Sequence, residues 1–167
     1  RDRYLRDFKI SSPKTALNDN PEKYELGKLL FEDKILSLSG SVSCKTCHNI
    51  NFGTGDAIPF SIGVGGKGEG NNRLQELGDI TPRNAPHLFN KGHNSYRSLF
   101  WDGRVSYNKR LKTYKTPEPN LNGDNPLYSF ITDKIDNVMA MQALFPMLSE
   151  IEMKGELFPE LSNLEVW

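Results

Sequence analysis

The sequence predicts a mainly α-helical fold with long loops and little strand. Two capped apolar segments predict helices, one beginning after Asn20 and one after Thr132 or Asp133. Between them lie stretches so rich in glycine or proline that regular structure is disfavoured. The 167 residues suffice for one domain and are too few for two of ordinary size. We therefore expect an N-terminal arm, residues 1–19, followed by a single domain, residues 20–167.

The first element after the arm is the most clearly marked helix. Asn20 is suited to cap a helix, and Pro21 suits the first helical position because proline lacks the amide hydrogen that is unpaired there. The segment EKYELGKLLF that follows places Leu26, Leu29 and Leu30 on one apolar face. A serine-rich turn then ends this region, and the cluster CKTCH at residues 44–48 predicts a short helical turn.

Three later stretches predict loops, and one more segment predicts a helix. Residues 53–70, GTGDAIPFSIGVGGKGEG, are too rich in glycine for regular structure, and a long loop in a compact domain usually serves function. Pro82 and Pro86 keep the backbone extended on either side of Asn84, and residues 115–125 form the third loop. The last predicted helix runs from Thr132 or Asp133 to about residue 145, where Pro146 stops it.

Composition narrows the classes of function. Lysine plus arginine total 21 and aspartate plus glutamate total 21, so no basic charge favours a nucleic-acid partner. No apolar run approaches the roughly 20 residues that cross a bilayer, which predicts a soluble domain whose secretion signal lies outside the sequence. The two cysteines lie three positions apart, so they predict local chemistry instead of a disulfide framework.

The cluster CKTCH matches the attachment motif for haem c. In C-x-x-C-H the two thiols form thioethers with the haem vinyl groups and the histidine binds the iron, which assigns Cys44 and Cys47 to attachment and His48 to the proximal position. A zinc site would need a fourth ligand, His87 or His93. A thioredoxin-like redox pair would need a preceding strand, where this sequence predicts a helix. We therefore interpret the motif as the site of one covalent haem.

The sixth coordination position of that haem decides its function. Two strong axial ligands favour electron transfer, whereas an open position allows peroxide or oxygen to bind. Chemistry alone leaves several candidates for a distal ligand: His87, His93, Met139, Met141, Met147 and Met153. A methionine on a helical face is more often a core residue than a ligand.

Five blocks of the sequence, taken in order, resemble one known family. They are LGKLLFEDKILSLSGSVSCKTCHN, PFSIGVGG, RNAPHLFN, LFWDGRVS and MQALFPMLSEIEMKG, spanning residues 26–155. Together they resemble the N-terminal, peroxidatic haem domain of the bacterial di-haem cytochrome c peroxidases, a family that includes the di-haem enzyme that matures methylamine dehydrogenase. The resemblance implies a cytochrome c-like haem domain, with the haem held between the helix after CKTCH and the segment around Gln142.

The resemblance also implies roles for residues outside the attachment motif. The family's distal glutamine and glutamate match Gln142, which would orient peroxide, and Glu152, which would take and return its proton. The tryptophan between the family's two haems matches Trp101, an electron-transfer residue. An asparagine that binds calcium at the junction of the two haem domains matches Asn84, and further calcium ligands come from the other domain.

Two departures from the family pattern shape the expected function. Many members carry, after Ser-Ile-Gly, a histidine that blocks the iron, and this sequence has Val64 there. Because valine cannot bind iron, we expect a distal site that is permanently open. The family has two C-x-x-C-H motifs in one chain and this sequence has one, so we expect it to belong to a larger di-haem protein or complex.

The leading interpretation is a cytochrome c peroxidase-like oxidoreductase. It would reduce hydrogen peroxide at the open distal site, with electrons from a second haem domain or subunit or from a small redox protein. The alternative is a mono-haem electron-transfer subunit of a larger redox complex, and a third interpretation is a haem subunit that keeps the fold without activity. Because haem c is attached on the outer side of the bacterial inner membrane, we expect a periplasmic location, with a membrane tether as a further expectation.

Overall fold

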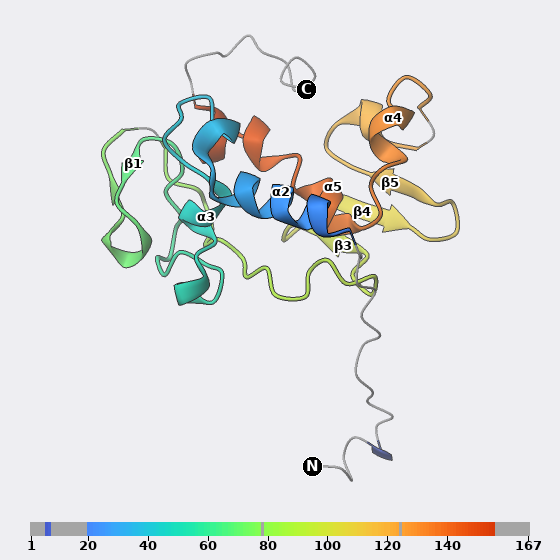
Figure 1. Cartoon of the computed structure of the whole chain (residues 1–167), viewed down its shortest axis with the longest axis horizontal. Helices are drawn as coiled ribbons and strands as arrows, with labels where there is room; N and C mark the ends of the chain where they lie inside the picture. Colours follow the sequence, from blue (N-terminus) through green and yellow to red (C-terminus); the bar gives the residue numbers. More distant parts are fainter. Residues whose placement is uncertain (1–5, 8–19, 78, 124, 156–167) are drawn as a thin grey trace.

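The computed structural model describes residues 6–7, 20–77, 79–123 and 125–155, in which helical segments outweigh strands. The mainly α content is thus as expected, although the helices are short and a small sheet accompanies them (Figure 1). The expected N-terminal arm, residues 1–19, lies outside the described residues apart from residues 6 and 7.

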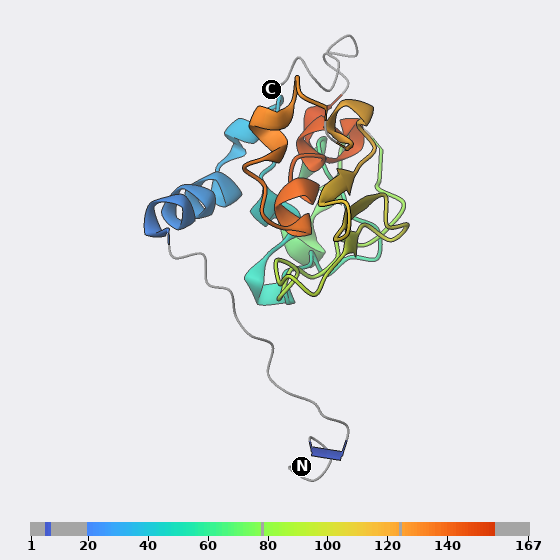
Figure 2. The ribbon, with the colours of Figure 1, turned by 90° about the vertical axis from the view of Figure 1, so that its right-hand side faces the viewer.

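Helix α2, Pro21–Glu32, confirms the first predicted helix and its cap. The Asn20 side chain accepts a hydrogen bond from the Lys23 amide at 2.9 Å, which pairs one of the free amides of the first turn. The predicted apolar face is exposed, with Leu26 at 57% and Leu29 at 67% of full accessibility. Figure 2 shows α2 along the outer side of the body. It is followed by the 3₁₀ turn η1, Lys34–Leu36.

Helix α3, Cys44–Cys47, confirms the predicted helical turn at the cysteine cluster. Ser43 and Thr46 form a capping box, in which the Ser43 amide donates to Thr46 Oγ1 at 3.0 Å. A 3₁₀ turn, η2 (Ile50–Phe52), leads into the glycine-rich loop. The loop is mostly irregular, as predicted, and its end pairs strand β1, Gly66–Lys67, with β2, Leu74–Gln75, around the turn η3, Gly70–Asn72.

A three-stranded antiparallel sheet follows the extended segment around Asn84, which has no regular structure. Its strands are β3 (Ser98–Leu99), β4 (Val105–Asn108) and β5 (Thr113–Lys115), with β4 in the centre. Tyr107 pairs with Tyr114 across β4 and β5, and their ring centroids are 4.9 Å apart. The predicted loop 115–125 contains the 3₁₀ turn η4, Pro119–Leu121.

The single long helix predicted from Thr132 or Asp133 is wrong. Helix α4, Ser129–Thr132, ends where that helix was expected to begin, and α5, Val138–Gln142, begins only after an irregular segment. The Tyr114 hydroxyl donates to the Ile135 carbonyl at 3.2 Å, and the Asn137 side chain accepts from the Ala140 amide at 2.9 Å. This local capping starts a new helix because asparagine competes well for free amides.

The chain then closes with two further turns. The 3₁₀ turn η5, Pro146–Leu148, has proline at its first position, and the π-helical turn η6, Glu150–Lys154, is capped by the Ser149 side chain. These turns pack against each other.

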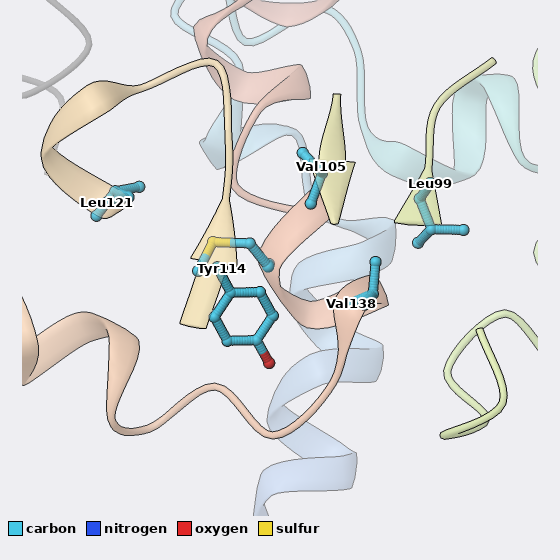
Figure 3. Packing of buried hydrophobic residues seen from close by; sticks show 6 residues of the cluster. Leu99, Val105, Tyr114, Leu121 and Val138 are labelled. Atoms are coloured by element: carbon cyan, nitrogen blue, oxygen red, sulfur yellow. The ribbon is translucent and has the colours of Figure 1, made fainter. Parts of the chain in front are cut away.

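Two apolar clusters hold the fold together. The larger lies between the sheet and α5, and Figure 3 shows its side chains converging from β3, β4, β5 and α5; it consists of Leu99, Val105, Tyr114, Leu121, Val138 and Met141. The smaller joins the segment before α3 to the glycine-rich loop and η6, and consists of Val42, Val64 and Met153. The smaller cluster adjoins the attachment motif.

Candidate functional site

The attachment motif occupies one turn of helix. Cys44 and Cys47 are the first and last residues of α3, three positions apart, so both lie on one side of the turn. Neither forms a disulfide, and each thiol is partly exposed. Burial raises the pKa of the Cys44 thiol, and burial together with the Asp56 charge raises the pKa of Cys47 to about 11, so both thiols are neutral near pH 7.

The ring of His48 is fixed by the loop that follows it. Its Nδ1 donates to the Thr54 carbonyl at 2.9 Å in the tautomer that this contact favours, so Nε2 is the nitrogen that would bind the iron. Burial lowers the pKa of His48, with opposing effects from hydrogen bonds to the Thr54 and Pro86 backbone, which favours the neutral ring that binds metals. The side chains of Cys44, Cys47 and His48 thus fit covalent haem with histidine as the proximal ligand.

Thr54 is a supporting residue that the sequence did not reveal. Its φ is 63°, a left-handed conformation that is uncommon outside glycine, and it places the Thr54 carbonyl at the His48 ring. The Thr54 hydroxyl accepts from the Leu88 amide at 2.7 Å, which ties the loop after the motif to the extended segment around Asn84. The only sequence signal was the loop's glycine content.

Asp56 in this loop is paired with the exposed Asn84 of the following extended segment. Asp56 is fully buried, and its Oδ1 accepts from the Asn84 amide at 3.1 Å and from the Ile58 amide at 3.3 Å. The Asn84 amide also donates to the Ile58 carbonyl. Both amide hydrogens are used, so the Asn84 Oδ1 is the atom left for a cation, which fits the calcium ligand that the resemblance implies.

The segment expected above the iron packs against the glycine-rich loop. The Val64 amide donates to the Glu152 carbonyl at 3.2 Å, so the residue in place of the family's blocking histidine lies beside the expected acid-base residue. A Cβ atom on Gly63 would overlap the Ile151 carbonyl oxygen and would lie 2.7 Å from the Glu152 Cα. Only glycine therefore allows this close approach.

A buried arginine holds that loop in shape. Arg73 donates from Nε to the Ile62 carbonyl at 2.6 Å and from its terminal nitrogens to the Gly63 carbonyl at 2.5 Å and the Gly68 carbonyl at 2.8 Å. Its burial lowers its pKa, an effect that the charges of Cys47, Asp56 and Glu69 oppose. Arg73 could not be predicted from the sequence, because no local pattern marks an arginine that binds carbonyls distant in sequence.

Glu152 and Gln142 lie at the ends of the final segment. Glu152 is partly buried in η6, and this burial raises the pKa of its carboxyl, with the Arg104 charge opposing the shift. The turn η6 packs on the glycine-rich loop through the bond between the Val64 amide and the Glu152 carbonyl, and the Cys47 sulfur lies 4.0 Å from the Ile62 carbonyl oxygen of the same loop. Gln142 is the last residue of α5, and its carbonyl accepts from the Phe145 amide at 3.1 Å. A carboxyl with a raised pKa is suited to proton transfer near neutral pH.

Trp101 lies on the surface. It is 70% exposed, and the guanidinium of Arg83 stacks over its ring at 3.9 Å from the centroid. It is therefore not a core residue of the described part of the chain, and an exposed indole is suited to a contact with another domain or protein.

The other candidates for the distal ligand are occupied by packing or face solvent. Met141 is buried in the larger cluster and Met139 packs against it, whereas Met153 belongs to the smaller cluster. Met147 packs against that smaller cluster. Of the two remaining histidines, His87 is exposed and the partly buried His93 bonds Ser95 Oγ through Nδ1 at 2.8 Å.

Two hollows in the described residues lie away from the attachment motif. One of about 840 Å³ lies between the β4–β5 hairpin and α4, and one of about 330 Å³ lies beside β1 and Arg73. Neither is lined by Cys44, Cys47 or His48, so the chemistry of the side chains identifies the site better than the shape of the surface.

Within the described residues, no group of three or more histidine, cysteine or acidic side chains is arranged to hold a metal ion, which a zinc site would require. In the same residues, no helix is long and apolar enough to cross a membrane. The motif and the bonded His48 ring form the candidate site for haem c, and Glu152 lies on the turn that packs against the neighbouring loop.

Comparison with known proteins identifies the family of this domain. Residues 21–165 match the family model for di-haem cytochrome c peroxidases, and the chain belongs to that family. It is 43% identical over 95 residues to cytochrome c551 peroxidase of Pseudomonas aeruginosa, an alignment that covers 54% of the chain and 23% of the relative. It is 38% identical over 103 residues to the methylamine utilization protein MauG of Methylorubrum extorquens, an alignment that covers 62% of the chain and 25% of that relative. The chain thus spans about a quarter of these relatives.

Proposed function

We propose that this chain is the peroxidatic haem domain of a periplasmic cytochrome c peroxidase. The observation that carries the proposal is the backbone hydrogen bond between Val64 and Glu152, which brings together a residue that cannot bind iron and a residue whose carboxyl is suited to proton transfer. Membership of the di-haem cytochrome c peroxidase family supports the same reaction class. The domain would act within a larger di-haem protein or complex, since the matched segment covers only about a quarter of these relatives.

The proposed reaction reduces hydrogen peroxide with two electrons and two protons to two molecules of water. Haem c, attached at Cys44 and Cys47 and bound through His48, supplies an iron that exchanges electrons with peroxide. Glu152 accepts the proton of the near peroxide oxygen and delivers it to the departing oxygen, while Gln142 orients the peroxide by hydrogen bonding. Both roles are those that the family resemblance implies, and the chemistry of the two side chains is consistent with them.

The electrons come from a second haem domain or subunit, or from a small redox protein. The exposed Trp101 is the proposed contact for that transfer, because its ring is available to a partner. Asn84 is the proposed ligand for calcium at the same junction, with its Oδ1 left free by Asp56 and Ile58. Covalent attachment of haem c outside the inner membrane supports the periplasmic location.

A mono-haem electron carrier is the second candidate function. The observation that favours it is the position of Met153, whose side chain lies in the same small apolar cluster as Val64. A thioether in that position is a suitable sixth ligand for an electron-transfer haem. In this case Glu152 has no chemical role.

Replacement of Glu152 by glutamine tests the proposal, because it removes the proton acceptor with little change in shape. We expect the rate at which the haem-loaded chain reacts with hydrogen peroxide to fall by about 10²-fold or more. Glu150→Gln is the matched control, since Glu150 lies on the same turn with its side chain 58% exposed, and we expect it to retain the parental rate. Equal rates in the parent and Glu152→Gln would refute the assigned role.

A further inference from the structure

A buried arginine lies where the glycine-rich loop turns back on itself. Arg73 follows the turn η3 and precedes β2, and its amide donates to the Gly70 carbonyl at 3.0 Å. Because β2 pairs with β1 of the same loop, the backbone of Arg73 is held beside residues 62–68. Only 4% of Arg73 is exposed, so the loop encloses its side chain.

The guanidinium of Arg73 binds the loop on both sides of β1. A guanidinium is planar and its donors point in fixed directions, so one arginine can hold several carbonyls at once. Nε and one terminal nitrogen bind the consecutive carbonyls of Ile62 and Gly63, before β1, and the other terminal nitrogen binds the carbonyl of Gly68, after β1. Between them, a Cβ on Gly66 would lie 2.8 Å from the nearer terminal nitrogen. The loop is therefore wrapped closely around the guanidinium.

The first of these carbonyls also lies beside the attachment motif. The Ile62 carbonyl oxygen, which Arg73 Nε binds at 2.6 Å, is 4.0 Å from the Cys47 sulfur. A thioether at Cys47 has no S–H group to donate, whereas the guanidinium keeps its donors. Arg73 therefore remains bound to this carbonyl when the cysteine carries haem.

The second carbonyl belongs to the residue that packs on the final segment. A Cβ on Gly63 would overlap the backbone of Glu152, and the amide of the next residue, Val64, donates to the Glu152 carbonyl at 3.2 Å. The bonds from Arg73 to Ile62 and Gly63 thus fix the stretch of loop that lies between Cys47 and η6.

We propose that Arg73 is a positioning residue for the peroxide reaction. By binding three loop carbonyls it holds the loop against η6, and so fixes the places of Val64 and Glu152. It acts through the geometry of its fork of donors, which a single ammonium group cannot reproduce. The inference rests on the proposed function for its purpose, whereas the hold of Arg73 on the loop exists whatever the substrate.

Hydrogen exchange of the haem-loaded full chain, read by mass spectrometry, tests this hold on the loop. In Arg73→Gln we expect amides of residues 62–68 to exchange about 10-fold faster or more, because the bridging bonds are lost, while β4 and β5 exchange at the parental rate. Arg110→Gln is the control, because it removes an equal charge from the exposed turn between β4 and β5 and should leave the loop unchanged. Parental exchange of residues 62–68 in Arg73→Gln overturns the proposal.

A double-mutant cycle tests whether Arg73 acts through Glu152. We expect Arg73→Gln to slow the reaction of the haem-loaded chain with hydrogen peroxide by about 10-fold or more, since small misplacements of reacting groups are costly. In the Glu152→Gln background the same change should have little further effect, because the group that Arg73 positions is already absent. Equal losses in both backgrounds would show a purely structural role and overturn the proposal. An unaltered rate in Glu152→Gln alone, with a loosened loop in Arg73→Gln, refutes the proposed function and supports the hold on the loop.

Two milder variants test the same bonds without the loss of a buried charge. Arg73→Lys keeps the charge but not the fork of donors, and we expect its loop exchange and peroxide rate to resemble those of Arg73→Gln. Gly66→Ala keeps Arg73 and pushes a methyl group against its guanidinium, so we expect faster exchange of residues 62–68. Parental exchange and parental rates in both variants would overturn the proposal.

Discussion

The two halves of the molecule are built on different principles. The sheet half, residues 96–145, packs three strands and α5 around six buried apolar residues. Among the described residues, the haem half, residues 42–64 and 146–155, has a cluster of three. The His48 ring bonds the Thr54 carbonyl and the Arg73 guanidinium bonds the Ile62 carbonyl, and these bonds hold its loop. In the part of the chain that the structure describes, the half with the attachment motif therefore has the smaller apolar cluster, and a buried cofactor would add apolar surface to it.

Removal of the attachment cysteines should have the largest effect and should separate the halves. In Cys44→Ala/Cys47→Ala we expect loss of covalent haem and of amide protection throughout the haem half, with protection retained in β4 and β5. Hydrogen exchange read by mass spectrometry measures both halves at once. Uniform protection across the two halves of the haem-free chain would contradict the comparison.

A matched pair of methionines tests the two cores separately. Met141 is fully buried in the larger cluster and Met153 is 5% exposed in the smaller one. We expect Met141→Ala to lower the free energy of unfolding by about 2–5 kcal/mol, because tight packing prevents the site from collapsing. Met153→Ala should cost less in the haem-free chain, since fewer buried side chains surround it. Chemical denaturation measures the free energy of unfolding of both variants. Equal losses in Met141→Ala and Met153→Ala would contradict the difference between the two clusters.

The sequence predicted those structural features that depend on interactions between residues close together in the chain. The cap of α2 at Asn20 and the helical turn at CKTCH could both be predicted, because capping groups and motif residues are neighbours in sequence. The predicted helix from residue 132 failed because the Tyr114 hydroxyl, contributed by a distant strand, binds the Ile135 carbonyl. A contact between elements of this kind leaves no pattern in the helix itself.

The residues of the candidate site also differ in how far the sequence alone predicts them. Cys44, Cys47 and His48 follow from one motif, whereas Gln142 and Glu152 required resemblance to a family, because neither forms a recognisable motif alone. Arg73 and Arg104 act on groups far away in sequence, so only the folded chain reveals them.

Replacement of Gly63 should disturb the haem half alone. The new Cβ in Gly63→Ala would meet the backbone of Glu152, which must then move away from the loop. We expect the peroxide reaction to slow by about 10-fold or more, since small misplacements of reacting groups are costly. Gly92→Ala is the control, because a Cβ there meets no atom within 4 Å. An equal loss in both variants would rule out a specific effect.

The stability of the chain should depend on pH through the partly buried carboxyl of Glu152. Burial raises the pKa of Glu152 above its ordinary value of 4.5, so the unfolded state ionises first as pH rises. The folded chain therefore loses stability from about pH 4.5 until its own carboxyl ionises. Glu152→Gln should be more stable than the parent at neutral pH, with the difference vanishing below pH 4.5. Melting temperatures across pH measure this, and a parallel offset at every pH would contradict it.

Trp101 should show the smallest effect on stability. Because its side chain is 70% exposed, Trp101→Phe should change the free energy of unfolding by no more than about 0.5 kcal/mol. The same change should slow electron delivery from a reduced redox partner, measured by stopped flow after mixing. A large stability loss with unchanged electron delivery would remove Trp101 from the proposed path.

The proposed peroxidase reaction needs an open position opposite His48, and spectroscopy of the haem-loaded chain tests this most directly. We predict high-spin ferric haem as isolated, rapid binding of carbon monoxide after reduction, and conversion to low-spin haem in Val64→His, where imidazole replaces a side chain that cannot bind iron. Exclusively low-spin, six-coordinate haem in the parent chain, inert to carbon monoxide, would contradict the account and favour the electron carrier.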